Sequence, residues 1–357
     1  MSGKQIKRIL NRRIVIAAIL MILLNTLCLS TANAQGGWVQ VVGDGTGGGN
    51  GFGDAGNWGS YSMAVLGSYL YVGTGNWDGC EVWRSSDGTT WNQVNIDGFG
   101  DVGNEIAFSM AVFGSHLYVG TKGGAGCEVW RTNDGTTWTQ VNTDGFGDNG
   151  NLRASSMAVF GSHLYVGTNN EVGCEVWRSS DGTTWTQVNT DGFGDAGNQY
   201  ARSMAVFGNH LYVGTENGVG CEVWRSNDGT TWTQVNTDGF GDAGNLYALS
   251  MAVSGSYLYV GTMNEVGCEV WRSSDGTTWT QVNTHGFGDA GNGWAFSMAV
   301  FGSYLYAGAN NDVGCEVWRL SATPIPTLTE WGLLVLLLLL VVTAIIVIRQ
   351  RRPATSM

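Results

Sequence analysis

One pattern of residues recurs six times through this chain at a constant spacing of 47 residues. Six methionines and six cysteines mark the copies, namely Met63, Met110, Met157, Met204, Met251 and Met298, and Cys80, Cys127, Cys174, Cys221, Cys268 and Cys315. A fixed period of roughly 40 to 50 residues is typical of a propeller or a solenoid, in which each repeat is one supersecondary unit. The 56 glycines among 357 residues fit a chain rich in turns and exclude an ordinary helical enzyme.

Each copy contains four short apolar runs separated by turn signals. In the third copy, Gly161-Ser162 separates the first two runs and Asp181-Gly182 separates the last two. Both pairs favour the positive φ angles of a two-residue hairpin turn. The apolar content falls from the first run to the last, as in a propeller blade whose first strand lines the axis and whose last strand faces water. A β-solenoid is the less favoured alternative, because its turns recur at shorter intervals.

The number of copies indicates how the ring closes. The first three runs occur six times, but the fourth follows only five of them, at Trp91, Trp138, Trp185, Trp232 and Trp279. A similar run, Trp38–Val41, precedes the first copy. We therefore predict an all-β, six-bladed β-propeller over residues 35–320, in which the N-terminal strand completes the last blade and leaves no open edge. Deletion of Trp38–Val42 should then remove most of the stability.

The first 34 residues have the three parts of a secretory signal peptide. A basic start is followed by an apolar run over residues 14–24 and by small residues that end in Ala32-Asn33-Ala34. We expect the signal peptide to span residues 1–34 and the mature chain to begin at Gln35. An uncleaved membrane anchor is the alternative, which N-terminal sequencing of the exported protein would reveal.

The C-terminal end has the pattern of a membrane anchor. Residues 333–348 form an apolar run of 16 residues in which Thr343 is the only polar one, and residues 349–357 form a basic tail. Counted from Trp331, the run reaches the roughly 17 residues that a transmembrane helix needs. The arginines after it place the tail in the cytoplasm and the bulk of the chain outside.

The segment before this run, within residues 321–332, resembles the IPTL-CTERM sorting signal, which consists of a short motif, a membrane helix and an arginine cluster. The resemblance is carried by Ile325, Pro326, Thr327, Leu328, Glu330, Trp331 and Gly332. Such tails occur on exported proteins of Gram-negative bacteria that have an exosortase-type processing enzyme. The resemblance implies a transient anchor and a final place at the cell surface or in the extracellular matrix; a permanent anchor is the alternative.

Charge excludes one class of partner. The formal net charge is −12, and eight of the 17 basic residues lie in the two terminal segments. The region between them is therefore strongly acidic. Because nucleic-acid binding depends on a basic face that neutralises phosphates, we expect no nucleic-acid partner.

The turn between the last two strands of a copy resembles the Asp-box hairpin of sialidase-type propellers. In the first copy it runs from Ser85 to Trp91, with glycine directly after Asp87, which departs from the usual pattern by one residue. An aspartate here can accept backbone N–H bonds, the glycine can take positive φ, and the tryptophan can pack back on the blade. In the family this hairpin is structural, and we expect the same here.

The copies differ mainly in two connections, from the second to the third strand and from the fourth strand to the next first strand. In an up-and-down blade both lie on one face, which makes that face the candidate binding surface. Its aromatic and arginine residues suit a carbohydrate, because rings stack on sugar faces. The alternative is that these side chains only fill gaps between blades. The predicted ligand-binding residues are Trp58, Tyr61, Trp77, Arg153, Tyr200, Arg202, Tyr247, Trp294 and Phe296.

The glycine-rich segment Asp97–Asn104 and its copies offer oxygen atoms to a cation. Calcium needs 6 to 8 oxygen ligands, and the spacing of an EF-hand is absent. His285 replaces the first aspartate in one copy. We therefore expect a structural turn and no cofactor, with calcium as the alternative.

The six cysteines beyond the signal peptide occupy equivalent places on separate blades. A disulfide requires Cα atoms within about 7 Å, which diverging blades do not provide. We expect buried free thiols that pack as small apolar side chains.

An enzyme finds little support in the sequence, because catalysis needs a few groups with different roles. Glu81 and Arg84 recur identically in every copy, which favours pairing within the ladder or between blades. His116 and its copies stand where other repeats have tyrosine. We predict a non-enzymatic surface propeller that binds glycan or matrix polymer; a sialidase-like or other glycoside-processing enzyme and a purely structural surface protein are the alternatives.

Overall fold

The computed structural model describes residues 42, 50–302, 304–311 and 314–321. The chain divides into two units, residues 1–53 and residues 54–357, which we describe separately. In the first unit the described part contains one 3-10 turn, η1 (Asn50–Gly53). The second unit contains every described strand, and its described part has no α-helix.

The strands of the second unit form five four-stranded blades and a sixth with three described strands. Each blade is an antiparallel meander. The strands of blades 1 to 3 are β1 (Gly59–Leu66), β2 (Tyr69–Gly75), β3 (Val82–Ser85), β4 (Asn92–Gln93), β5 (Ile106–Phe113), β6 (His116–Lys122), β7 (Val129–Thr132), β8 (Thr139–Gln140), β9 (Arg153–Phe160), β10 (His163–Asn169), β11 (Val176–Ser179) and β12 (Thr186–Gln187). Those of blades 4 to 6 are β13 (Tyr200–Phe207), β14 (His210–Glu216), β15 (Val223–Ser226), β16 (Thr233–Gln234), β17 (Tyr247–Ser254), β18 (Tyr257–Met263), β19 (Val270–Ser273), β20 (Thr280–Gln281), β21 (Trp294–Phe301), β22 (Tyr304–Asn310) and β23 (Glu316–Ser321).

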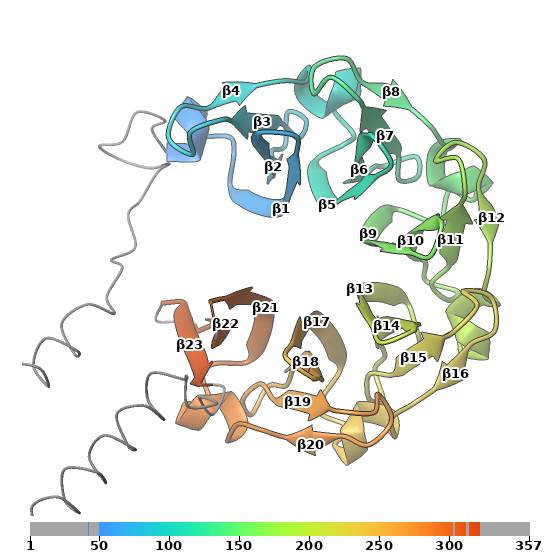
Figure 1. Cartoon of the computed structure of the whole chain (residues 1–357), viewed down its shortest axis with the longest axis vertical. Helices are drawn as coiled ribbons and strands as arrows, with labels where there is room; N and C mark the ends of the chain where they lie inside the picture. Colours follow the sequence, from blue (N-terminus) through green and yellow to red (C-terminus); the bar gives the residue numbers. More distant parts are fainter. Residues whose placement is uncertain (1–41, 43–49, 303, 312–313, 322–357) are drawn as a thin grey trace, which may run out of the picture. The chain divides into compact units, whose positions relative to one another are not determined.

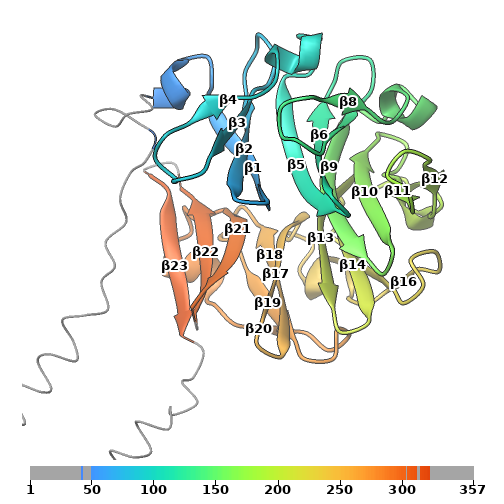
Figure 2. The same ribbon diagram turned by 45° about the horizontal axis from the view of Figure 1, so that its top comes forward.

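The blades of this unit are arranged around a common axis. Figure 1 shows the first strand of each blade nearest the axis and the short fourth strand outermost, as the sequence predicts. Turned by 45°, Figure 2 shows the first strands of successive blades side by side. The second strands are the most deeply buried, since β10 is buried at six of its seven positions. The propeller-like repeat of blades is therefore confirmed.

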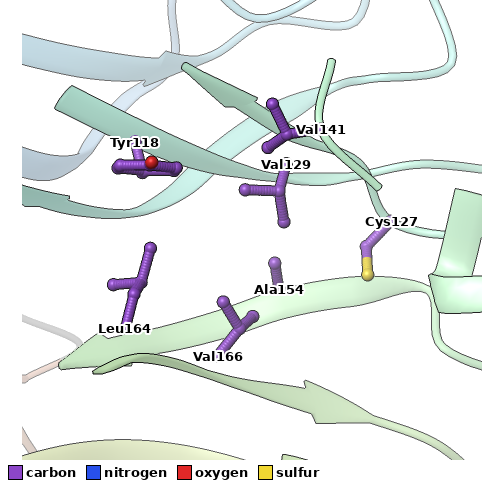
Figure 3. Close-up of a cluster of buried hydrophobic side chains, with 7 residues drawn as sticks. All are labelled: Tyr118, Cys127, Val129, Val141, Ala154, Leu164 and Val166. Carbon is purple, nitrogen blue, oxygen red and sulfur yellow. The ribbon is translucent and has the colours of Figure 1, made fainter. Parts of the chain in front are cut away.

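The hydrophobic cores lie between blades rather than inside them. In one cluster Tyr118, Cys127 and Val129 of blade 2 pack against Leu164 and Val166 of blade 3 (Figure 3). The same cluster recurs at the next two blade boundaries. Burying one valine or leucine side chain contributes about 1.5 to 3 kcal/mol, so each boundary holds its blades together chiefly by apolar contact.

The Asp-box-like hairpins lock neighbouring blades. Asp181 accepts the backbone N–H groups of Thr183 and Thr184 at 2.8 and 2.7 Å, and Gly182 has a φ of +73°. A Cβ on Gly182 would lie 1.8 Å from the hydroxyl of Tyr118 in the preceding blade. The predicted turn chemistry is confirmed, and the glycine additionally makes room for a tyrosine of the neighbouring blade.

A 3-10 turn with an unusual phenylalanine precedes each first strand from blade 2 onward. The turns are η2 (Asp97–Gly100), η3 (Asp144–Gly147), η4 (Asp191–Gly194), η5 (Asp238–Gly241) and η6 (His285–Gly288). Phe193 has a φ of +60°, a conformation that a bulky residue rarely adopts. Its ring stacks on Trp224 of the following blade at a centroid distance of 4.9 Å. The stacking across the blade boundary offsets the backbone strain. The sequence indicated neither the strain nor the stacking.

The terminal segments of the prediction lie outside the described residues. These are the signal peptide over residues 1–34, the closing strand at Trp38–Val41, the sorting motif and the apolar run over residues 333–348. In the described part, β23 pairs only with β22. No helix within the described ranges is long and apolar enough to cross a bilayer.

The cysteine prediction requires one correction. All six are free, and five are buried, but Cys315 is exposed. The buried five stand at boundaries with a following blade, as Cys127 does against Val166. Cys315 lies in the last described blade, so no described blade follows to cover it.

Candidate functional site

The two variable connections meet at one end of the blades. The last residue of each second strand pairs with the first residue of the next first strand, as Lys122 does with Arg153 and Asn169 with Tyr200. These single bridges bring variable residues of neighbouring blades together. The expectation that both connections share one face is therefore correct.

A β-bulge near the start of every first strand places one further variable residue at this end. The register shifts between Ser60 and Ser62 in β1, and equivalent shifts occur in the other five blades. Bulges redirect a side chain and often lie beside binding sites. The serine after the bulge ties the blades together, because Ser62 Oγ donates to the carbonyl of Ala107 at 2.7 Å. The bulge residues are Tyr61, Phe108, Ser155, Arg202, Leu249 and Phe296.

The rings and guanidinium groups at this end form one continuous series of contacts, which we call the aromatic–arginine band. It begins with Trp77 stacked on Trp58 at 5.4 Å and continues through Tyr61 to Phe108 at 5.3 Å. Each further step spans 4.0 to 5.5 Å between ring centroids or from a guanidinium carbon to a ring. In order, the band consists of Trp77, Trp58, Tyr61, Phe108, Arg153, Tyr200, Arg202, Tyr247, Trp294 and Phe296.

All nine residues predicted as ligand-binding lie in this band. The predicted set did not include Phe108. The sequence could have indicated it, because Phe108 occupies the same repeat position as Tyr61. Several rings remain open to solvent: Trp77 is 66% exposed, Phe296 53% and Trp58 43%. The alternative that these side chains only fill gaps between blades does not describe such exposed rings.

The charges of the band are unequally paired. Arg202 donates from Nε to Glu216 Oε2 at 2.7 Å, and Lys122 forms an ion pair with Glu105. The side chain of Arg153 makes no ion pair or hydrogen bond with any described residue, and its guanidinium lies over the rings of Phe108 and Tyr200. The band therefore holds one arginine whose donor groups are unused.

Two tyrosines of the band are held in their neutral form. Burial raises the pKa of Tyr61, although the nearby Arg153 opposes the rise. Burial, followed by the neighbouring carboxylate of Glu216, raises the pKa of Tyr247. Both hydroxyls therefore keep their proton at neutral pH and can donate a hydrogen bond as well as accept one.

Beneath the band lies a polar layer that is the same in most blades. Glu128 Oε2 accepts from Asn104 Nδ2 at 2.6 Å and from the indole of Trp130 at 2.7 Å. Burial raises the pKa of the Glu128 carboxyl. The repeated arginine does not bind this glutamate. In blade 1, Arg84 donates to the carbonyl of Asp134 in the next blade at 3.2 Å. The predicted pairing between blades is thus seen for the arginine, whereas asparagine and tryptophan bind the glutamate.

One group of potential metal ligands occurs among the described residues, formed by Asp242, Glu269 and His285. His285 Nε2 lies 2.7 Å from Glu269 Oε1, and Asp242 accepts from Asn264 Nδ2 at 3.0 Å. Two carboxylates and an imidazole supply fewer oxygens than the 6 to 8 that calcium requires. This group does not fit the calcium alternative.

Two protein-family models match segments of the chain, one within the propeller and one at the C-terminal end. The model of the DUF6242 beta propeller domain matches residues 101–194 and 145–262. The model of the IPTL-CTERM motif matches residues 323–352, so the chain carries this sorting motif as the sequence indicates. No curated protein matches the sequence.

Solved structures with TM-scores above 0.5 share the fold at low sequence identity. A protein from Lactobacillus plantarum is 13% identical with a TM-score of 0.55, over 75% of this chain and 82% of that one. The extracellular domain of a hybrid two-component system from B. thetaiotaomicron is 17% identical with a TM-score of 0.53, over 79% of this chain and 36% of that one. Trypanosoma rangeli sialidase in complex with the inhibitor DANA is 12% identical with a TM-score of 0.44, over 76% of this chain and 56% of that one.

Proposed function

We propose that this chain, a propeller with an IPTL-CTERM motif, is an exported, surface-sorted, non-enzymatic binding protein. Its ligand is a glycan or another polymer of the extracellular matrix. The observation that carries the proposal is the aromatic–arginine band, to which all six blades contribute. The band occupies positions at which the repeats differ, whereas the blade scaffold is uniform.

The chemistry of the band suits an extended saccharide. Exposed rings such as Trp77 and Phe296 offer apolar faces on which sugar rings stack. Such side chains have few rotatable bonds, so they lose little conformational entropy on binding. Neutral tyrosine hydroxyls and arginine donors can bond sugar hydroxyls between the stacked rings. A band that crosses several blades fits a polymer of several sugar units better than one small molecule.

A glycoside-processing enzyme is the weaker candidate. Most glycosidases use two carboxyl groups on either side of the scissile bond, whereas sialidases use a tyrosine nucleophile. Two carboxylates beside the band, Glu216 and Glu105, are each engaged with a cation. The buried Glu128 and its copies are bound by asparagine and tryptophan in the layer beneath. These arrangements support binding rather than acid–base chemistry.

Three further features belong to the same proposal. Residues 1–34 act as a cleaved signal peptide, and the strand at Trp38–Val41 completes blade 6. Residues 333–348 form a transmembrane helix that anchors the chain until an exosortase-type enzyme processes it. The propeller then remains at the cell surface or in the matrix.

The test is a binding screen of the full-length chain, purified in detergent because of the apolar run over residues 333–348, against glycans and exopolysaccharides. We expect selective binding that Trp294→Ala and Tyr200→Ala weaken by about tenfold or more, since a stacked ring contributes roughly 1 to 3 kcal/mol in comparable sites. Tyr69→Ala, at the opposite end of blade 1, serves as the control. Absence of binding across the panel, or equal loss with the control, would contradict the proposal.

A further inference from the structure

A polar depression of about 340 Å³ lies beside the band, lined by residues of blades 2, 3 and 4. Residues at four consecutive connections, from β6–β7 to β12–β13, line it. Three of them, Lys122, Arg153 and Gln199, occur at their repeat positions in no other copy. Its lining includes Lys122, Arg153, Asn169, Glu171, Gln199 and Tyr200. Two of them, Arg153 and Asn169, have polar groups that nothing in the described part of the chain satisfies.

Arg153 is positioned without being neutralised. The rings of Phe108 and Tyr200 lie 5.5 and 5.3 Å from its guanidinium carbon, and these contacts restrict the side chain. Its five N–H donors make no hydrogen bond to any described residue. A planar guanidinium with free donors matches the two oxygens of a carboxylate.

Asn169 supplies a second, independent observation. It is only 5% exposed, and its side-chain oxygen has no hydrogen-bond partner among the described residues. The same is true of the hydroxyl of the bulge residue Ser155. A buried polar atom without a partner costs about 1 to 3 kcal/mol, so a ligand hydroxyl that reaches Asn169 would recover stabilisation that the protein alone lacks.

Two charged side chains of the lining, Arg153 and Glu171, form no ion pair with any described residue. Lys122 is neutralised by Glu105. Glu171 is exposed at the rim, and its backbone carbonyl accepts from Gln199 Nε2 at 3.3 Å. No described acidic side chain forms an ion pair with Arg153.

We propose that this depression binds a uronic acid unit of an acidic polysaccharide. The carboxylate accepts from the Arg153 guanidinium, and a ring hydroxyl of the same sugar donates to Asn169 Oδ1. The proposal rests on the glycan-binding function proposed above and names the class of sugar. A neutral hexose would offer Arg153 only hydroxyl oxygens and no opposite charge, whereas a uronic acid pairs its carboxylate with the guanidinium and its hydroxyl with Asn169.

The experiment compares polygalacturonate with its fully methyl-esterified form, which keeps the sugar and removes the charge, using the full-length chain in detergent. We expect tighter binding to polygalacturonate, weakened about tenfold or more by Arg153→Gln and also weakened by Asn169→Leu. Arg178→Gln, on the uniform strand β11, should leave the affinity unchanged. Arg153→Lys, which keeps the charge, and the melting temperature of each variant separate a lost contact from a lost fold.

The other outcomes are decisive as well. Equal affinity for both polymers, unaffected by Arg153→Gln, overturns the uronate site while leaving glycan binding in place. Failure to bind either form or any glycan of the screen overturns both proposals. Equal binding of polyglutamate shows that Arg153 recognises carboxylates without the sugar, and also overturns this inference.

Discussion

The two ends of each blade differ in how freely their residues vary, although the backbone at both ends is repeated. At the hairpin end, bonds within the turn fix the side chain of Asp181, and Tyr118 of the neighbouring blade leaves no room for a side chain at Gly182. At the variable end, the backbone is tied by uniform groups such as Ser62, while bulge residues such as Tyr61 and Arg202 take no part in that scaffold. Variation is therefore tolerated where the scaffold does not use the side chain.

This comparison teaches where function can reside in a repeat protein. Equivalent blades can place different groups in one site only at positions whose side chains the repeated scaffold does not use. The bulge and the bridge between neighbouring blades create those positions. Changes at the hairpin end should therefore affect stability, and changes in the band should affect binding.

The largest effect is expected at the hairpin end. Gly182→Ala places a Cβ 1.8 Å from the Tyr118 hydroxyl at a φ of +73°, so overpacking adds to backbone strain. We expect the free energy of unfolding to fall by about 3 kcal/mol, measured by denaturant unfolding.

Gly161→Ala is the matched control in the same blade. Gly161 has a φ of +59°, and no described atom outside its immediate neighbours lies within 4 Å of the added Cβ. Only the backbone strain remains, at about 1 kcal/mol. Equal losses for the two variants would show that the contact with the neighbouring blade does not matter.

Much of this architecture could be predicted from the sequence. The 47-residue period, the Asp-Gly turn and the variable connections located the blades, the hairpin at Asp181 and the nine predicted members of the band. These features are local or repeated, so a single sequence displays them. The stacking of Phe193 on Trp224 could not be predicted, because it joins two blades through a positive φ that phenylalanine rarely adopts.

The hydrogen-bond partners of individual polar side chains also could not be predicted from the sequence. Glu128 and Arg131 are close in the repeat and suggest a pair, yet Glu128 binds Asn104 and Trp130. Which of two nearby partners a side chain selects depends on the tilt and spacing of the blades. For the same reason the sequence did not reveal that Arg153 remains unpaired whereas Arg202 binds Glu216.

A smaller effect on stability, but a clear one on binding, is expected in the band. Tyr247 and Tyr257 lie at opposite ends of blade 5, on strands β17 and β18. Tyr247→Ala should weaken glycan binding by about tenfold, since it removes one stacking ring. Tyr257→Ala should leave the affinity unchanged.

Both variants should lower the free energy of unfolding by a similar amount, about 1 kcal/mol, because both rings are partly buried. Calorimetric titration and thermal melting of the same samples would measure the two effects. If Tyr257→Ala weakened binding as much as Tyr247→Ala, the division between the two ends would fail.

The smallest expected effect is on the pH dependence of stability, to which the two ends of the blades contribute with opposite sign. Burial raises the pKa of Glu81, Glu128, Glu175 and Glu222 beneath the band. These groups bind more protons in the folded state, so stability falls as pH rises through their folded pKa values. At the hairpin end, bonds from the backbone lower the pKa of Asp181, and stability is lost as pH falls below the unfolded value of about 3.8.

The melting temperature should therefore rise as the pH is lowered from neutral towards the ordinary glutamate pKa of 4.5, and fall below the ordinary aspartate pKa of 3.8. Glu175→Gln should reduce the rise, because it removes one of the buried titrating groups. Asp181→Asn should reduce the fall instead. If Glu175→Gln altered only the fall, the buried carboxylates would not control the neutral side of the profile, and the electrostatic contrast between the two ends would be wrong.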